Sequence, residues 1–281
     1  MIAKDKPQLA MLVALMSEAK PLIDQFGLRP VQQGGMTLYR RAEQQYEISL
    51  LVTGIGRVPM ATSVGWLAGV LGEARTAWLN VGTAGHAEMA VGEVVRIVHC
   101  DNVLSGRAHY VPLVVPWKGS IGSLVTADQA TSDYPEASLV DMEGAAFFES
   151  CLRFAPAELV QSIKVVSDNR ETDLTQINGE TLTKLIGGAT ATIETFSTAM
   201  LDLCAKLPEV DVSPAELIES LSTSKISVTQ RRQLGDLTRR LLNTGESLDD
   251  LIGTYAKNKN VSLILSDMRT RLESRAPVLN G

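Results

Sequence analysis

The sequence predicts an α/β domain, with helices layered on a mostly parallel central sheet, followed by a small C-terminal all-α appendage. Between residues 9 and 207, short apolar runs alternate with segments that have helical spacing. Glycine turns follow several of these runs, as at residues 53–56 and 82–85. Beyond Leu207, no unit of strand, glycine turn and helix recurs. Strands that alternate with helices are typical of a parallel sheet covered by helices.

Each expected strand is a short apolar run, and each expected helix is a longer segment with apolar residues three and four positions apart. Gly27 is expected to end the first helix, because glycine readily takes the left-handed conformation found after helix ends. Ligands bind at the carboxyl ends of strands in such sheets, so the glycine turns and Ser167-Asp168 are expected to share one edge. The expected strands are residues 9–15, 46–52, 77–81, 91–100 and 159–166, and the expected helices are residues 17–26, 58–71, 182–207 and most of 140–154.

The appendage is expected to begin at residue 213, which gives two domains, residues 1–207 and residues 213–281. Three helix starts follow one another: Ser213 precedes a proline, Ser227 has a glutamine three residues on, and Ser247 precedes an acidic turn. The apolar positions here form the core of a self-contained bundle, or part of them faces a partner. No group of catalytic side chains stands out in this region. The apolar positions are Leu217, Leu221, Leu234, Leu237, Leu241, Leu242, Leu251 and Ile252.

Composition and charge exclude several classes of protein. The chain has 281 residues, 45% of them hydrophobic, which is enough for one large core or for a core and a small accessory domain. Its 26 Lys and Arg against 32 Asp and Glu give a net charge of -6 and form no basic run, which argues against a nucleic-acid partner. The apolar run at residues 9–15 is too short to span a membrane and is not a signal peptide. The expected partner is a small molecule or another protein.

The cysteines and histidines give no sign of a disulfide framework or a metal site. Cys100, Cys151 and Cys204 are widely spaced in largely apolar surroundings, which indicates reduced core thiols and a cytoplasmic location. His86, His99 and His109 have no metal-ligand spacing and are expected to be surface or loop residues. We therefore expect neither a metal nor a cofactor.

Two short stretches point to chemistry, Asp141-Met142-Glu143 and Ser167-Asp168. Each places a carboxylate at the edge of an apolar segment, where a partly buried acid binds a sugar hydroxyl or moves a proton. Glu143 lies beside small apolar residues, where an unpaired buried charge is costly, so a functional role is favoured over a structural one. Structural roles are open for two other acids: Glu18 suits the first turn of a helix, and Asp168 suits a turn before Asn169.

The chain resembles the nucleoside phosphorylase and nucleosidase superfamily, most closely its methylthioadenosine/S-adenosylhomocysteine nucleosidase branch. A single motif of this kind is weak, but six in the family's order, spread over residues 9–200, are specific. The resemblance implies a phosphorylase-like α/β fold and an enzyme that breaks N-glycosidic bonds. The six motifs are residues 14–19, 53–58, 80–85, 91–95, 141–146 and 167–168.

The resemblance also implies roles for individual residues. Asp168 is expected to protonate N7 of a purine, because protonation turns a poor leaving group into a neutral one. Glu18 is expected to position the attacking water. Among the substrate-binding residues, Glu143 is expected to hold ribose hydroxyls, Met142 to pack on the sugar, and Ser167 to orient the acid or the base. The implied substrate-binding residues are Thr83, Ala84, Gly85, Met142, Glu143 and Ser167.

The acceptor of the sugar is either water or phosphate. Relatives that use phosphate tend to carry arginine where this chain has Asn80, which favours water and hence a purine nucleosidase acting on a nucleoside or thionucleoside. Arg57 and Lys164 leave a cationic contribution, and so a phosphorylase, as the alternative. A third hypothesis is a non-catalytic nucleoside-binding or scaffolding protein whose helical appendage contacts a partner.

The sequence departs from the nucleosidase pattern between Gly92 and Asp141, where the family usually has a longer stretch with a base-stacking aromatic. The corresponding residues 125–130 contain no aromatic. Trp117, Tyr110 and Tyr134 are the candidates to replace it, and the spacing selects none of them. The resemblance also implies a homo-oligomer, most simply a homodimer, in which a neighbouring subunit closes the pocket.

Overall fold

The computed structural model describes residues 6–72, 74–129, 131, 134–135, 137–172, 177–207, 214–221, 226–243, 246–258 and 260–274. The chain divides into two compact units, Met1–Leu207 and Pro208–Gly281, which are described separately. Within the described ranges, no helix is long and apolar enough to cross a membrane.

The first unit is built on one ten-stranded sheet. Its strands pair in the order β10, β6, β8, β9, β5, β1, β4, β3, β2, and β7 pairs with β6. Because β10 also pairs with β5, the strands β5, β9, β8, β6 and β10 close into a ring. The strands are β1 Gln8–Val13, β2 Arg29–Gln33, β3 Met36–Ala42, β4 Glu47–Val52, β5 Thr76–Gly85, β6 Val94–Asn102, β7 Arg107–Tyr110, β8 Ser120–Thr126, β9 Ser138–Asp141 and β10 Val160–Asp168.

The expectation of a mostly parallel sheet is wrong, because five strand pairs are parallel and five are antiparallel. Three hairpins, β2–β3, β3–β4 and β6–β7, supply part of the antiparallel pairing. The rest comes from the pairs β6–β10 and β5–β9, which belong to the ring. Strand β2 is largely exposed and polar, and β9 is only four residues long, so neither gives the apolar run used to predict strands.

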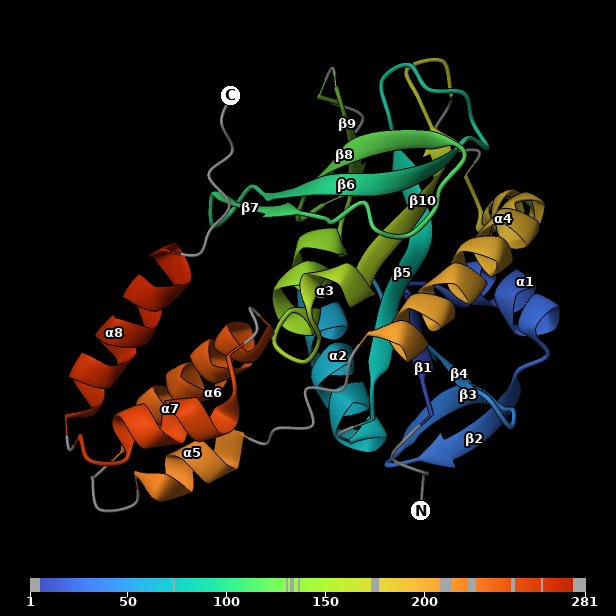
Figure 1. Ribbon diagram of the computed structural model, residues 1–281. Coiled ribbons are helices and arrows are strands. Elements are labelled where there is room, and N and C mark those ends of the chain that lie inside the picture. Colours follow the sequence, from blue (N-terminus) through green and yellow to red (C-terminus); the bar gives the residue numbers. More distant parts are fainter. Residues whose placement is uncertain are drawn as a thin grey trace. The chain divides into compact units, whose positions relative to one another are not determined.

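Helices cover both faces of the sheet. Figure 1 shows α1 and α4 on one side of the central strands and α2 and α3 on the other. The two sides correspond to two hydrophobic clusters, one containing Leu22 and Ile193 and the other containing Leu67 and Phe147. Gly27 takes the left-handed conformation (φ 61°) that ends the first helix, as predicted. The helices are α1 Met16–Phe26, α2 Arg57–Leu71, α3 Gly144–Cys151 and α4 Gly179–Lys206, and a 3-10 turn, η1, spans Ala157–Leu159.

Two boundaries differ from the prediction, and both bear on the site. Residues 82–85 were expected to form a turn, but β5 runs to Gly85, because β10 pairs with it as far as Asp168. Residues 140 and 141 were expected to open a helix, but they end β9, and α3 begins at Gly144. The Asp141 carboxylate accepts a hydrogen bond from the Gly144 amide (2.8 Å), so the side chain that ends the strand also starts the helix.

The second unit contains four helices within its described residues: α5 Pro214–Ser220, α6 Val228–Asn243, α7 Leu248–Tyr255 and α8 Val261–Ser274. The apolar positions singled out in the sequence are buried or partly buried in one cluster, which Tyr255 and Met268 join. Ser227 and Ser247 accept hydrogen bonds at the starts of α6 and α7, as predicted for N-caps. The predicted cap Ser213 lies outside the described residues.

Candidate active site

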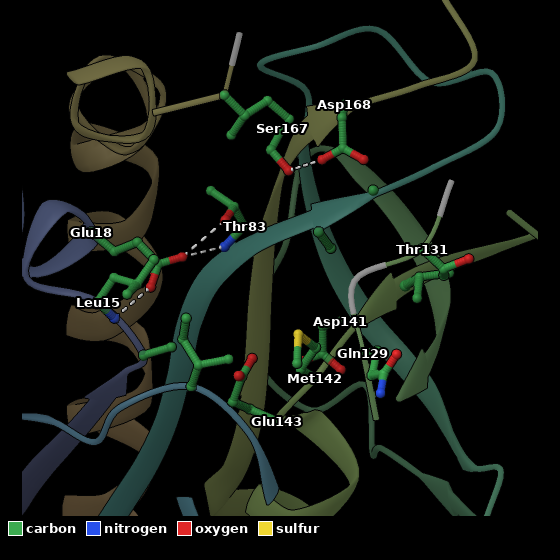
Figure 2. Close-up of a pocket in the computed structure, with 16 residues that line it drawn as sticks. Leu15, Glu18, Thr83, Gln129, Thr131, Asp141, Met142, Glu143, Ser167 and Asp168 are labelled. Carbon is green, nitrogen blue, oxygen red and sulfur yellow. Dashed lines mark hydrogen bonds between the residues drawn. The ribbon is translucent and has the colours of Figure 1, made fainter. Parts of the chain in front are cut away.

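A cavity of about 320 Å³ opens in the first unit where β1, β5, β9 and β10 end. Parallel strands of one sheet bring their carboxyl ends to the same edge, which is where ligands bind in sheets of this kind. Figure 2 shows that its labelled acids approach the cavity from different sides. The lining residues are Ala14, Leu15, Glu18, Ile55, Thr83, Ala84, Gly85, Gln129, Thr131, Val140, Asp141, Met142, Glu143, Ser167, Asp168 and Ile177.

All eight residues singled out in the sequence line this one cavity. They come from segments far apart in the chain: the start of α1, the end of β5, the β9–α3 junction and the end of β10. The structure therefore brings these separate motifs together around one cavity. The eight residues are Glu18, Thr83, Ala84, Gly85, Met142, Glu143, Ser167 and Asp168.

Glu18 is buried (2% exposed), and its carboxylate bridges α1 and β5. One oxygen, Oε2, accepts from the Leu15 amide at 3.0 Å, and the other, Oε1, accepts from the Thr83 amide at 2.8 Å. The Thr83 hydroxyl donates to Oε1 as well, at 2.9 Å (Figure 2). Glu18 thus caps its own helix and is held at the edge of the cavity by three donors.

Glu143 lies at the junction of β9 and α3, and its Oε1 accepts a hydrogen bond of 2.6 Å from the Gly56 amide. Burial raises the pKa of Glu143, and the nearby Asp141 carboxylate raises it further, while Lys164 and the Gly56 amide act in the opposite direction. Gly56 belongs to the turn that starts α2, so the glycine motif at residues 53–56 serves to anchor this acid.

Lys164, one of the two residues that left a cationic contribution open, lies buried next to these acids. Lys164 sits on β10 (1% exposed), and its Nζ is 2.8 Å from Oδ2 of Asp141. Burial alone lowers the pKa of Lys164, but the Asp141 and Glu143 carboxylates outweigh it and leave the pKa raised. A Cβ at Gly82 would lie 3.3 Å from Oε1 of Glu18 and 3.4 Å from this Nζ, so both groups pack over Gly82.

Asp168 ends β10 and accepts from two hydroxyl groups. Ser167 donates to Oδ1, and Tyr134 donates to Oδ2 at 2.5 Å. None of the three candidate aromatics is among the described residues that line the cavity, and Tyr134 contacts the site only through Asp168. Trp117 is in the core, edge-on to the Phe196 ring, and Tyr110 is 79% exposed. Of the segment expected to carry the aromatic, Gln129 lines the cavity, and Ala130 lies outside the described residues.

The described residues that line the cavity include no lysine, arginine or histidine. Arg57 is engaged elsewhere, since its guanidinium donates to Asp128, to Asn102 and to the Thr126 carbonyl. Asn80, the position compared with the arginine of phosphate users, is buried between strands: its amide donates to the Leu12 carbonyl and accepts from the Ser162 hydroxyl.

No cysteine or histidine is among the described residues that line the cavity. All three cysteines are free and buried, as predicted. His86 lies in the loop after β5, as predicted, but its side chain is buried, and its Nδ1 accepts hydrogen bonds from the amides of Glu88 and Met89. His99 and His109 lie on paired strands and not in loops. Within the described part of the chain, no cluster of acids, histidines or cysteines has the arrangement of a metal site.

No protein-family model and no curated protein sequence matches the chain. Solved structures do match its fold. The 5'-methylthioadenosine/S-adenosylhomocysteine nucleosidase of S. pneumoniae, solved with a transition-state inhibitor, is 22% identical, with a TM-score of 0.55 over 69% of this chain and 99% of that chain. The Arabidopsis thaliana 5'-methylthioadenosine nucleosidase is 19% identical, with a TM-score of 0.55 over 74% of this chain and 99% of its own.

The futalosine hydrolase of Helicobacter pylori strain 26695 is also similar, at 18% identity and a TM-score of 0.53, over 70% of this chain and 98% of that one. Each of these proteins is matched along nearly its whole length, whereas a substantial part of this chain has no counterpart in it. The resemblance predicted from the six motifs is thus confirmed at the level of the fold: the chain contains the fold of the nucleosidases of the nucleoside phosphorylase superfamily.

Proposed function

We propose that this protein is a purine nucleosidase, which hydrolyses the N-glycosidic bond of a nucleoside or thionucleoside with water as the acceptor. The observation that carries the proposal is the convergence of Glu18, Glu143 and Asp168 on one cavity whose described lining contains no cationic side chain. The fold shared with solved nucleosidases and a futalosine hydrolase supports the same reaction class.

Asp168 is the proposed general acid on the base side. A purine leaves poorly as an anion, so a proton delivered to N7 as the bond breaks turns it into a neutral leaving group. Both hydrogen-bond partners of Asp168 are hydroxyls, which accept as well as donate. The carboxyl group can therefore carry a proton or lose one while both hydroxyls keep a hydrogen bond to it.

Glu143 and Met142 form the proposed sugar side. One carboxylate oxygen of Glu143 is fixed by the Gly56 amide, which leaves the group oriented to accept from ribose hydroxyls in the cavity. As the base departs, the anomeric carbon becomes cationic, and a nearby carboxylate stabilises that charge. Met142 supplies an apolar, polarisable surface for the sugar.

Glu18 is the proposed residue that positions the attacking water. Two of its three donors are backbone amides, which cannot move away or accept a proton. Such a carboxylate has a fixed direction and lone pairs left to accept from a water molecule. A water held in this way is already oriented for attack, which removes part of the entropic barrier to the reaction.

The charge of the side chains that line the cavity favours water over phosphate as the acceptor of the sugar. Phosphate carries negative charge, and proteins bind it with arginine, lysine or clustered amides. The described lining offers carboxylates instead, and Lys164 is already paired with Asp141. Repulsion between phosphate and Glu18 or Glu143 favours neutral water.

The direct test is a panel of nucleosides, incubated with the protein with and without phosphate. Methylthioadenosine, adenosylhomocysteine, futalosine and inosine cover 6-amino and 6-oxo bases and different 5' groups. We expect the free base to be released without phosphate. Chromatography of the products measures this release. Release that requires phosphate would replace the hydrolase with a phosphorylase. Tight binding without release, by the wild type and by Asp168→Asn alike, would favour the non-catalytic alternative.

We further propose that the protein forms a homodimer that covers the Ile55 edge of the cavity. Ile55, Val58 and Leu104 are 52%, 76% and 68% exposed. They belong to one surface, because Oδ1 of Asn102 links the two segments. It accepts a hydrogen bond from the Arg57 side chain at 2.7 Å and another from the Leu104 amide. Sedimentation of the wild type is expected to give a dimer, and Val58→Asp a monomer with weaker substrate binding. An unchanged mass for Val58→Asp would remove this surface from the proposal.

The buried free thiols Cys100, Cys151 and Cys204 support a cytoplasmic location, where thiols stay reduced. Fractionation of the source cells, with the protein detected by antibody, tests this placement.

A further inference from the structure

Tyr134 is buried directly behind the proposed general acid. The side chain is 6% exposed and packs with Ala87 and Val140, with Ala127 at the edge of the cluster. It is not one of the residues that line the cavity, yet its hydroxyl donates to Oδ2 of Asp168 at 2.5 Å. Tyr134 therefore reaches the cavity only through Asp168.

The contact between Tyr134 and Asp168 fits in the sheet because Gly85, on β5, has no side chain. A Cβ built on Gly85 would lie 2.5 Å from Cε1 of Tyr134 and even closer to Oδ2 of Asp168. Any side chain larger than glycine at this strand position would have to displace the tyrosine, the carboxyl group or both. Gly85, which also lines the cavity, thus makes room for this pair.

The Tyr134 hydroxyl stays protonated and acts as a hydrogen-bond donor. Burial raises the pKa of Tyr134, and the hydrogen bond to Asp168 raises it further, so the hydroxyl keeps its proton under ordinary conditions. A tyrosine with a fixed proton and one nearby carboxylate donates to that carboxylate throughout the reaction.

We propose that Tyr134 is a positioning residue that holds the Asp168 carboxyl group and favours the transfer of its proton to the purine. This inference rests on the proposed nucleosidase reaction. Asp168 begins the step as a neutral acid, loses its proton to N7 as the C–N bond breaks, and ends as a carboxylate. A hydrogen bond from a neutral donor to a carboxylate is stronger than one to a carboxylic acid. The contact is therefore stronger in the transition state than in the substrate complex, and such interactions raise kcat.

The decisive variant is Tyr134→Phe, which removes the hydroxyl and keeps the ring. Two substrates separate the roles: a purine nucleoside accepted by the wild type, and 4-nitrophenyl β-D-riboside, whose nitrophenolate leaves without a proton. We expect kcat on the purine nucleoside to fall about 10- to 100-fold, the range for loss of one hydrogen bond to a charged group, with little change in KM. Cleavage of the nitrophenyl riboside is expected to keep its wild-type rate.

Three further variants complete the design. Asp168→Asn is expected to show the same selective loss, and adding Tyr134→Phe to it is expected to cost nothing more, because the tyrosine acts through the acid. Tyr39→Phe removes a hydroxyl from β3, away from the cavity, and is expected to leave both rates unchanged. Thermal unfolding of each variant shows whether it is folded.

The outcomes are distinguishable. Equal losses on both substrates would mean that Tyr134→Phe distorts the whole site, and an unchanged kcat on the purine nucleoside would mean that the hydroxyl is idle. Either result overturns the inference and leaves the nucleosidase proposal standing. If the wild type cleaves no nucleoside of the panel, the proposed function fails first, and the role of Tyr134 fails with it.

Discussion

The two halves of the cavity differ in their main hydrogen-bond donors. In the sugar half, Glu18 and Glu143 accept mainly from backbone N–H groups, those of Leu15, Thr83 and Gly56, and Glu18 also accepts from the Thr83 hydroxyl. In the base half, which comprises Asp168, Ser167 and Tyr134, the carboxyl group accepts only from hydroxyls among its described side-chain contacts. A backbone N–H group can only donate, whereas a hydroxyl both donates and accepts.

This difference assigns the roles more sharply than the presence of three acids does. A carboxylate fixed by amides is suited to bind hydroxyls or water and to remain near a positive charge. A carboxyl group fixed by hydroxyls is suited to gain and lose a proton. The sugar half also contains a buried cation, Lys164, against the three carboxylates of Glu18, Asp141 and Glu143.

The largest effect is expected for Asp168→Asn in the base half. The amide cannot supply the proton, so kcat on purine nucleosides is expected to fall about 10²- to 10⁴-fold, the usual contribution of a general acid. Steady-state kinetics at fixed pH measure this directly. The sugar half is unchanged in this variant, so the dissociation constant of the nucleoside is expected to stay within a few-fold of the wild-type KM. A loss that appears in binding and not in kcat would assign Asp168 to the sugar or to the fold.

The next effect is on stability and concerns Lys164→Met in the sugar half. Removing the cation leaves Asp141 buried with a charge that nothing balances, and breaking a buried ion pair from one side costs roughly 3–5 kcal/mol. Urea unfolding followed by tryptophan fluorescence reports on the α/β unit alone, because Trp66, Trp78 and Trp117 are the only tryptophans and all lie in it. The midpoint is expected to move to a clearly lower urea concentration.

Lys184→Met is the matched control for that experiment. Lys184 pairs with Glu180 at 2.9 Å on the exposed surface of α4, almost the same distance as the buried pair. Exposed pairs of this kind contribute little, so its unfolding midpoint is expected to match that of the wild type. Equal midpoints for the two variants would mean that Lys164 does not balance the acids of the sugar half.

Much of the site was predictable from the sequence, because its acids stand where local patterns end. Glu18 follows the first strand within a few residues, and Asp168 ends a strand of nine buried residues. The end of an apolar segment can be recognised in the sequence alone. The ring of strands was not visible, because apolar periodicity reports which residues are buried and not which strand lies beside which. The direction of β9 relative to β5, fixed by a single pair at Gly85 and Val140, carries no local signal.

The partners of the acids were the part that the sequence concealed. Tyr134 and Asp168 are 34 positions apart, and the sequence suggested Tyr134 only as one of three candidates for a base-stacking ring, not as a partner of the acid. Lys164 did carry a signal, because a charged residue between the apolar residues Ile163 and Val165 requires a buried partner. That rule pointed to an ion pair but not to Asp141, since the partner comes from a different strand.

The smallest effect tests the sugar half through its pH dependence. Burial raises the pKa of Glu143, with a further contribution from Asp141, so this group takes up a proton at a higher pH than an ordinary glutamate does. Ribose hydroxyls bind best to the carboxylate, which accepts at both oxygens. Binding is therefore expected to weaken as the pH falls through the raised pKa, and to be complete above it. The measurement is the dissociation constant of a nucleoside by calorimetry, in the Asp168→Asn background, where neither turnover nor Asp168 contributes.

Adding Glu143→Gln to that background isolates the titrating group. The glutamine oxygen still accepts from the Gly56 amide, so the fold of the turn is preserved. The lost charge is expected to weaken binding about tenfold at neutral pH, within the range for a hydrogen bond to a charged group, and to make it independent of pH in the acidic range. If the pH dependence persists in this variant, the titrating group is another acid, and Glu18 or Asp141 would have to be tested in its place. If it disappears, the sugar half binds through a charge, whereas the base half works through a proton.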